Sequence, residues 1–157
     1  MRRFCHFCQS LVRIEENGEK FYRRVADISE EGNVKESFTF LADEEVKHRE
    51  TFEEMLPEIE KYEPPEAYPP EYFAYLRAYA DNIIFKAGID KELPENMDAI
   101  SAVDFGIHRE LDSIAYYYEA KKFVPEVERS LIDKIIEEER RHFVELSELK
   151  EKLQKGD

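Results

Sequence analysis

The 157-residue sequence has few of the residues that bend or staple a chain: five glycines, two cysteines and no tryptophan. The two cysteines form a single CxxC, Cys5 and Cys8, which is too few for the disulfide framework of a secreted mini-protein. Scarce glycine, abundant Glu, Lys and Arg, and the lack of any useful stretch of alternating apolar residues argue against a sheet protein. The sequence therefore predicts an all-α protein.

The sequence also lacks long apolar runs and an excess of positive charge. With 23 basic and 37 acidic residues the net charge is −14, which argues against nucleic acid or an anionic membrane as a partner. No apolar run approaches the roughly 20 residues of a membrane span. The opening segment, MRRFCHFCQSLVRIEENGEK, becomes charged too soon for a secretory signal. We expect a cytoplasmic protein whose acidic surface attracts small cations.

Proline is concentrated in the middle of the sequence. Six of the seven prolines fall between Pro57 and Pro94, in a stretch that includes YEPPEAYPPEYF. Proline restricts the backbone and cannot continue a helix, so this stretch predicts an extended crossover over about residues 61–96, with a short helix near 71–86.

The crossover separates two predicted helical hairpins. The first spans about residues 5–60 and turns at SEEGNV; the second spans about 97–155 and turns at FVPE, where Pro125 suits the first turn of a new helix. Two antiparallel pairs joined by a long connection form a four-helix bundle with one crossover. We expect one domain over residues 1–157.

Steps of three and four residues trace one face of each predicted helix, and these faces are apolar except near their middle. The second helix carries Glu45 and His48 there, and the fourth carries Glu139 and His142, each pair as Glu-x-x-His. The first and third helices carry one central carboxylate each. The remaining inward positions of the second and fourth helices are Phe38, Leu41, Phe52, Met55, Ile59, Ile132, Ile135, Leu146, Leu149 and Leu153.

The central carboxylates of the first and third helices are Glu15 and Glu110. Counted from the two turns at 1.5 Å per residue, all six polar groups fall at one level to within about one helical turn. An isolated carboxylate in an apolar interior costs several kcal/mol, so four of them would unfold a small bundle without compensation. Bound divalent cations would provide that compensation.

The chemistry of this set favours two metal ions. Four carboxylates and two imidazoles without a thiolate suit iron or manganese better than a structural zinc. Two divalent ions neutralise four carboxylates, with Glu45 and Glu139 bridging both ions. Glu15 with His48, and Glu110 with His142, would then complete the separate ends.

The two hairpins repeat one pattern. Glu15 and Tyr22 recur 95 residues later as Glu110 and Tyr117, and the Glu-x-x-His pairs recur at an offset of 94. This repetition suggests duplication and predicts a site with two-fold pseudosymmetry. We interpret the two tyrosines as core aromatics whose hydroxyls find a partner, with hydrogen bonds to the Glu ligands as a second role.

Four segments carry a resemblance to a known family: IEENGEKFY, LADEEVKHRETF, GIHRELDSIAYYYEAKKFVP and LIDKIIEEERRHF. They resemble the rubrerythrin-like branch of the ferritin superfamily over nearly the whole chain apart from the crossover. The resemblance implies a ferritin-like bundle with a carboxylate-bridged di-iron centre that reacts with hydrogen peroxide or dioxygen. The family's metal-binding and catalytic positions fall on Glu15, Glu45, His48, Glu110, Glu139 and His142.

On this resemblance we expect two iron ions, with manganese or zinc as substitutes, an external electron donor such as a rubredoxin-like protein or a reductase, and a homodimer. The sequence departs from full-length rubrerythrin because it has no rubredoxin module, which needs two CxxC pairs. It also has Ser113 where a further carboxylate is expected three residues after Glu110. Glu19 either supplies a seventh carboxylate or is a solvated residue at the end of its row.

The predicted function is therefore a rubrerythrin-like oxidoreductase that reduces peroxide or dioxygen. An iron-binding or storage protein that oxidises ferrous iron is the alternative, and a metal-free interaction bundle is a third interpretation.

Three smaller features remain open from sequence. Glu44 and Glu138 each precede a proposed ligand and either accept the ring N–H of the opposite histidine or face solvent. His6 and His108 lie off the inward rows and are expected at the surface. Cys5 and Cys8 are small core residues, a dithiol that feeds electrons to iron, or half of a Cys₄ metal site completed by a second chain.

Overall fold

The computed structural model describes residues 2–84 and 88–156, and every regular element in these ranges is helical. For residues 2–6, 8 and 92 only the backbone is described. The elements are α1 (Arg2–Ile28), α2 (Gly32–Lys61), α3 (Pro70–Asn82), α4 (Ile89–Glu92), α5 (Ala99–Ala120), the 3₁₀ turn η1 (Lys121–Phe123) and α6 (Glu126–Lys155).

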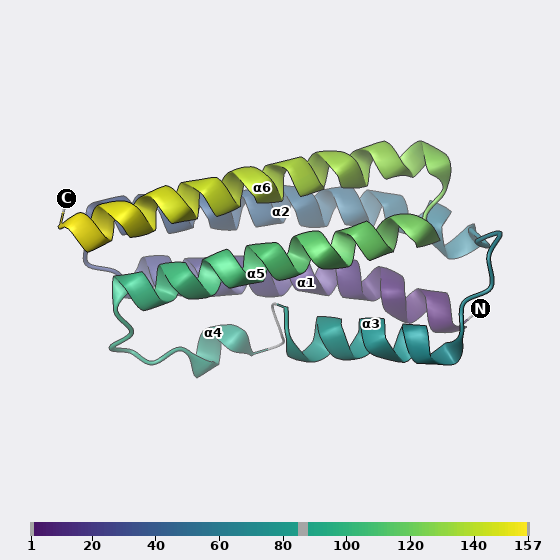
Figure 1. Cartoon of the computed structure of the whole chain (residues 1–157), viewed down its shortest axis with the longest axis horizontal. Helices are drawn as coiled ribbons and strands as arrows, with labels where there is room; N and C mark the ends of the chain where they lie inside the picture. The colour runs from purple at the N-terminus through teal and green to yellow at the C-terminus, as the bar shows by residue number, and fades with distance from the viewer. Residues whose placement is uncertain (1, 85–87, 157) are drawn as a thin grey trace.

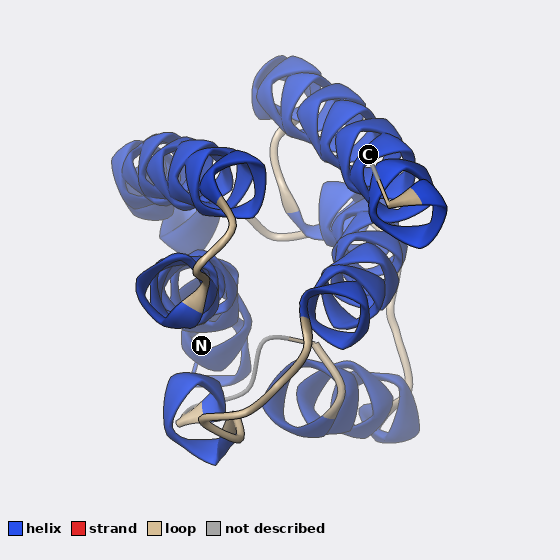
Figure 2. Ribbon diagram, turned by 90° about the vertical axis from the view of Figure 1, so that its left-hand side faces the viewer, coloured by secondary structure: helices blue, strands red, loops and turns tan. Residues whose placement is uncertain are grey.

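Four long helices form the bundle. α1 packs against α2, and α5 packs against α6, as two antiparallel hairpins that lie side by side (Figure 1). Seen along their axes, the four helices surround a common centre, while α3 and α4 lie outside them (Figure 2). The fold is an all-α four-helix bundle, as the sequence predicts.

The hairpin turns fall at the predicted places. α1 ends at Ile28, and α2 begins at Gly32 after a short break. In the second hairpin, Pro125 lies immediately before α6 in an extended conformation, so it caps the helix instead of occupying its first turn. Either position uses the same property, because proline has no backbone N–H to leave unpaired at a helix start.

The crossover contains two helices where the sequence predicts one. α3 begins at Pro70 and ends at Asn82, earlier than the expected end near residue 86. The four-residue α4 follows Gly88, whose φ of 77° is a left-handed conformation that favours glycine. α3 packs its buried Leu76 and Ala80 against the side of the bundle formed by α1 and α5.

The core follows the inward rows. On α2 and α6 every predicted inward position is buried except Leu153, which is half-buried. Aliphatic and aromatic side chains share the interior, and the largest fully buried side chains are mostly aromatic. Each large apolar side chain that is fully buried contributes about 1.5–3 kcal/mol. No helix in the described part of the chain is long and apolar enough to cross a membrane.

Candidate metal centre

Six polar side chains from all four bundle helices meet in the middle of this apolar core. They are the six predicted from the sequence, and each has at most 2% of its surface exposed. The helical period places them there, because steps of three and four residues keep a side chain on the face that the neighbouring helices cover. α1 contributes Glu15, α2 Glu45 and His48, α5 Glu110, and α6 Glu139 and His142.

The six residues form two overlapping groups. In one, ligand atoms of Glu15, Glu45, His48 and Glu139 all lie within 4.8 Å of one another. In the other, the same holds for Glu45, Glu110, Glu139 and His142. Glu45 and Glu139 belong to both groups, which is the arrangement that two bridging carboxylates require.

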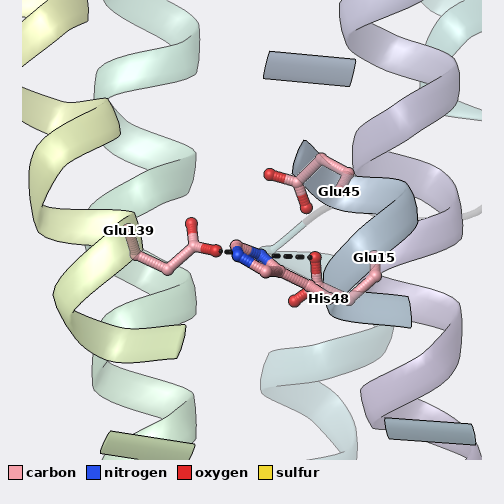
Figure 3. A group of neighbouring side chains, drawn as sticks. All are labelled: Glu15, Glu45, His48 and Glu139. Atoms are coloured by element: carbon pink, nitrogen blue, oxygen red, sulfur yellow. Dashed lines mark ion pairs between the residues drawn. The ribbon is translucent and has the colours of Figure 1, made fainter. Parts of the chain in front are cut away.

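In the group that contains Glu15 and His48, the histidine ring makes short contacts with several carboxylates. Figure 3 shows Glu139 of α6 pointing across the bundle toward His48 of α2, with Glu15 on the other side of the ring. The His48 Nδ1 atom lies 2.7 Å from Glu139 Oε1 and 3.5 Å from Glu15 Oε2. At the other edge of the ring, His48 Nε2 is hydrogen-bonded at 2.6 Å to Glu138 Oε2.

The group at the second hairpin is looser. His142 Nδ1 lies 3.8 Å from both Glu110 Oε1 and Glu139 Oε2, beyond hydrogen-bonding distance. The ring of His142 stacks 5.7 Å from that of His48. On another side it meets the half-exposed ring of Phe40, edge to face, at 6.3 Å. Nothing in the sequence signals this contact with Phe40, because Phe40 lies off the inward row of α2.

Two buried tyrosines connect the hairpins. The Tyr22 hydroxyl of α1 donates to Glu110 Oε1 of α5, and the Tyr117 hydroxyl of α5 donates to Glu15 Oε1 of α1. The pairing is reciprocal, so each hairpin supplies the hydrogen bond that orients the terminal carboxylate of the other. The sequence predicts a partner for each hydroxyl, and the structure supplies the crossed pairing.

Burial and mutual repulsion dominate the electrostatics of the cluster. Burial, together with repulsion from Glu15 and Glu139, raises the pKa of Glu45 well above its usual range. Burial and the charge of Glu139 likewise raise the pKa of Glu110. Burial opposes charge on Glu15 too, but hydrogen bonds with Glu45 and His48 outweigh it and lower the pKa of Glu15. The cluster therefore behaves as a set of carboxylates short of positive charge.

The His48 imidazole supplies part of that charge. Burial alone would lower its pKa, but the Glu139 charge and the hydrogen bond with Glu138 raise it well above the usual value for histidine. One imidazolium cannot balance four carboxylates, so compensation by the protein alone is incomplete.

The polar atoms that remain unpaired fit bound metal. Buried polar atoms without a hydrogen-bond partner are rare in folded proteins, and each costs about 1–3 kcal/mol. Here they concentrate in the cluster: Glu15 Oε2, Glu45 Oε1, His48 Nδ1, Glu110 Oε2, both Glu139 oxygens and His142 Nδ1. Each is an atom type that coordinates iron or manganese, so the residues present fit a bound metal.

Other candidates lie outside this cluster. The Glu19 carboxylate is 2.7 Å from Arg49 Nη1 and 2.9 Å from Arg23 Nε, so it belongs to a surface ion-pair network and not to the metal cluster. Ser113 is buried and supplies no carboxylate. His108 is exposed, as expected. Glu44 pairs with Lys47, and its carboxylate also lies within 4.8 Å of ligand atoms of His48 and Glu138. Of these two glutamates, Glu138 is the one that is hydrogen-bonded to His48.

The side chains of Cys5, Cys8 and His6 lie outside the described residues.

Comparisons with known proteins agree with the geometry. A family model described as rubrerythrin matches residues 10–150. A crystal structure from Thermotoga maritima, of a protein described as a ferritin-like diiron-carboxylate protein, superimposes with a TM-score of 0.65 and 27% sequence identity. The match covers 92% of this chain and 92% of the other. None of the curated proteins matches the chain.

Proposed function

The chain belongs to the rubrerythrin family, and from this premise we propose that it is a di-iron carboxylate oxidoreductase that reduces hydrogen peroxide or dioxygen with electrons from an external donor. The observation that carries the proposal is the overlap of the two groups, in which Glu45 and Glu139 are common to both. The Thermotoga protein, described as diiron-carboxylate, supports iron as the metal. Manganese and zinc are the substitutes to test.

In this proposal each residue of the cluster has a distinct position. Glu15 and His48 would hold one ion, Glu110 and His142 would hold the other, and Glu45 with Glu139 would contribute to both. Because these ligands come from both hairpins, the proposal treats residues 1–157 as one domain. When bound, an iron pair supplies reversible one-electron chemistry that carboxylates and imidazoles lack.

The surrounding side chains orient the cluster and exclude water. Tyr22 and Tyr117 each donate a hydrogen bond that fixes one terminal carboxylate. Two rings of α2 hold these tyrosines in place: Phe38 packs 5.6 Å from Tyr22, and Phe52 packs 5.3 Å from Tyr117. Burial raises the pKa of both phenols well above 10, so they remain protonated donors. Such partners of ligands tune metal affinity strongly.

The test is an anaerobic titration with ferrous iron, followed by stopped-flow mixing with peroxide or with dioxygen. We expect two ions per chain and, after oxidation, the near-ultraviolet absorbance of protein-bound ferric iron. Glu45→Ala should abolish that absorbance because it removes a ligand common to both ions. Glu54→Ala, an exposed glutamate of the same helix, is the matched control and should leave it unchanged.

Two results would contradict the proposal. One is a folded wild-type protein that takes up only traces of iron under these conditions. The other is an iron-loaded protein that reacts with neither oxidant. Comparing the oxidation rates with peroxide and with dioxygen identifies the preferred substrate.

The net charge of −14 supports a second candidate, in which ferrous iron is the substrate that the protein oxidises and sequesters. Storage of a mineral requires a closed shell of many subunits, whereas the oxidoreductase proposal expects a homodimer. Size-exclusion chromatography with light scattering separates the two, since a dimer cannot enclose a mineral core.

A further inference from the structure

A series of tyrosine rings runs from the buried cluster to the surface. It begins at Tyr117, whose hydroxyl is bonded to Glu15, and its ring lies 6.3 Å from that of Tyr116 on the same helix. Tyr116 lies 6.3 Å from Tyr79 on α3, and Tyr79 stacks almost parallel to Tyr75 at 6.0 Å. Tyr75 is 57% exposed.

The third ring of the series, Tyr79, is hydrogen-bonded to a carboxylate that can accept its proton. The Tyr79 hydroxyl donates a 2.9 Å hydrogen bond to Asp112 Oδ1 of α5. Arg109 lies 2.9 Å from the other Asp112 oxygen and holds the carboxylate in place. Burial and this hydrogen bond raise the pKa of Tyr79, so the phenol stays protonated until an electron is removed. Loss of an electron from Tyr79 therefore requires transfer of its proton, and Asp112 is placed to accept it.

The described ring neighbours of Tyr22 differ from those of Tyr117. Tyr22, the counterpart of Tyr117, packs against Phe21 and Phe38, whose rings lie 5.2 and 5.6 Å away. Phenylalanine is much harder to oxidise than tyrosine, so these two neighbours do not continue a series of oxidisable rings. The described ring contacts of the two duplicated tyrosines therefore differ in chemistry.

We propose that Tyr117, Tyr116, Tyr79 and Tyr75 form a one-electron path between the metal centre and the surface, in which Tyr79 is reversibly oxidised. The proposal rests on the function proposed above and gives the crossover helix α3 a role in it. Tyr117 and Tyr116 act as the aromatic bridge, and Tyr75 is the exposed end at which an external one-electron donor delivers its electron.

The electron balance identifies when the path is needed. Reduction of one hydrogen peroxide to two waters consumes two electrons and two protons. When the metal centre supplies only one electron, as one ferrous ion becoming ferric, Tyr79 supplies the other. Its O–H proton moves to Asp112, leaving a neutral phenoxyl radical, and the two protons for water come from solvent. An external donor then returns one electron, and Asp112 returns the proton to the Tyr79 oxygen.

The test locates protein radicals instead of measuring turnover. The 157-residue protein, loaded with one or with two ferrous ions per chain, is mixed with excess peroxide, without donor, in the presence of a nitroso spin trap. Peptide mass spectrometry then maps the adducts. We expect adducts on Tyr75 in several-fold excess over Tyr118, which is 45% exposed and makes no ring contact with the series in the described part of the chain.

Variants separate the path from a structural effect. Tyr79→Phe keeps the aromatic ring but removes the oxidisable phenol and should reduce the Tyr75 adduct several-fold, as should Asp112→Asn. Tyr118→Phe is the matched control and should leave the Tyr75 adduct unchanged. A dissolved one-electron photo-oxidant acting on the metal-free proteins should label Tyr75 equally in wild type and variants, which shows that its exposure is intact.

Several outcomes would overturn the path. Equal labelling of Tyr75 and Tyr118 indicates a diffusing oxidant, and absence of label at both iron loadings while the iron is oxidised indicates that no electron leaves the tyrosines. An unchanged Tyr75 adduct in Tyr79→Phe shows that Tyr79 is not the donor. None of these three results contradicts the proposed oxidoreductase function. Iron that never binds, or is never oxidised, removes both proposals.

Discussion

The two halves of the cluster have the same ligands in different surroundings. Each half has a terminal glutamate held by a tyrosine of the other hairpin and a histidine that follows a shared glutamate. In the first half, His48 is in close contact with a carboxylate at both ring nitrogens. In the second, the contacts of His142 Nδ1 are 3.8 Å long and an exposed phenylalanine lies beside the ring. The inner residues of the site are thus more symmetric than the residues that support them.

The difference between the histidines has a local cause. Glu138 on α6 reaches His48, but its counterpart Glu44 on α2 is paired with Lys47, three residues along the same helix. The residue three positions after Glu138 is Arg141, which is exposed. Glu44 therefore has a competing partner and lies within 4.8 Å of ligand atoms of His48 and Glu138. Among the described residues His142 has no counterpart of the hydrogen bond between His48 and Glu138, so the two metal positions should differ in affinity.

The largest expected effect is a difference in iron content between variants of a shared carboxylate and variants of a terminal carboxylate. Glu139→Ala removes a ligand of both groups, so we expect loss of both ions. Glu15→Ala leaves Glu45, Glu110, Glu139 and His142 in place, so one ion should remain. The measurement is iron per chain by elemental analysis after desalting, with circular dichroism to confirm that the helices persist. Equal iron content in the two variants would show that Glu139 does not bridge.

The next effect compares the residues that orient the histidines. Glu138→Gln weakens the hydrogen bond to His48 Nε2, and loss of such a partner typically lowers metal affinity about 10–100-fold. We expect this loss for one of the two ions. Glu44→Gln should lower affinity much less, because Glu44 pairs with Lys47 and lies near His48 and Glu138 without being hydrogen-bonded to the ring. Competition with a chelator measures both constants, and equal losses in the two variants would mean that the asymmetry vanishes when metal binds.

The sequence predicts the inner part of the site because the helical period is a strong signal. Glu45 and His48 lie in a row of α2 whose other members are apolar. An amphipathic helix buries its apolar face, so the two polar residues on that face are buried with it. The fold class follows from the same periodicity, together with the position of the prolines. The ligand role of the six residues remains a proposal, supported by their burial and their distances.

The supporting residues are less predictable because they depend on how the hairpins meet. From sequence, Glu44 and Glu138 are equivalent, and only the packed helices show that Glu138 is hydrogen-bonded to a histidine while Glu44 is paired with Lys47. The contact between Tyr79 and Tyr116 joins residues 37 positions apart in sequence, through a crossover that has no periodic relation to α5. Short-range patterns do not encode such contacts.

The smallest effect concerns access to the looser half. Phe40 covers one side of His142, while the position 94 residues later on α6 is Lys134, which is exposed. Phe40→Ala should therefore let a chelator remove one of the two ions a few times faster, and Lys134→Ala should not. Because Phe40 is already 45% exposed, the free energy of unfolding should change by no more than about 0.5 kcal/mol. Urea denaturation measures the change in the free energy of unfolding, independently of the rate at which the chelator removes the ion. If Phe40→Ala accelerates loss of both ions equally, the exposed ring protects the whole cluster, and the difference between the halves lies in the histidine contacts alone.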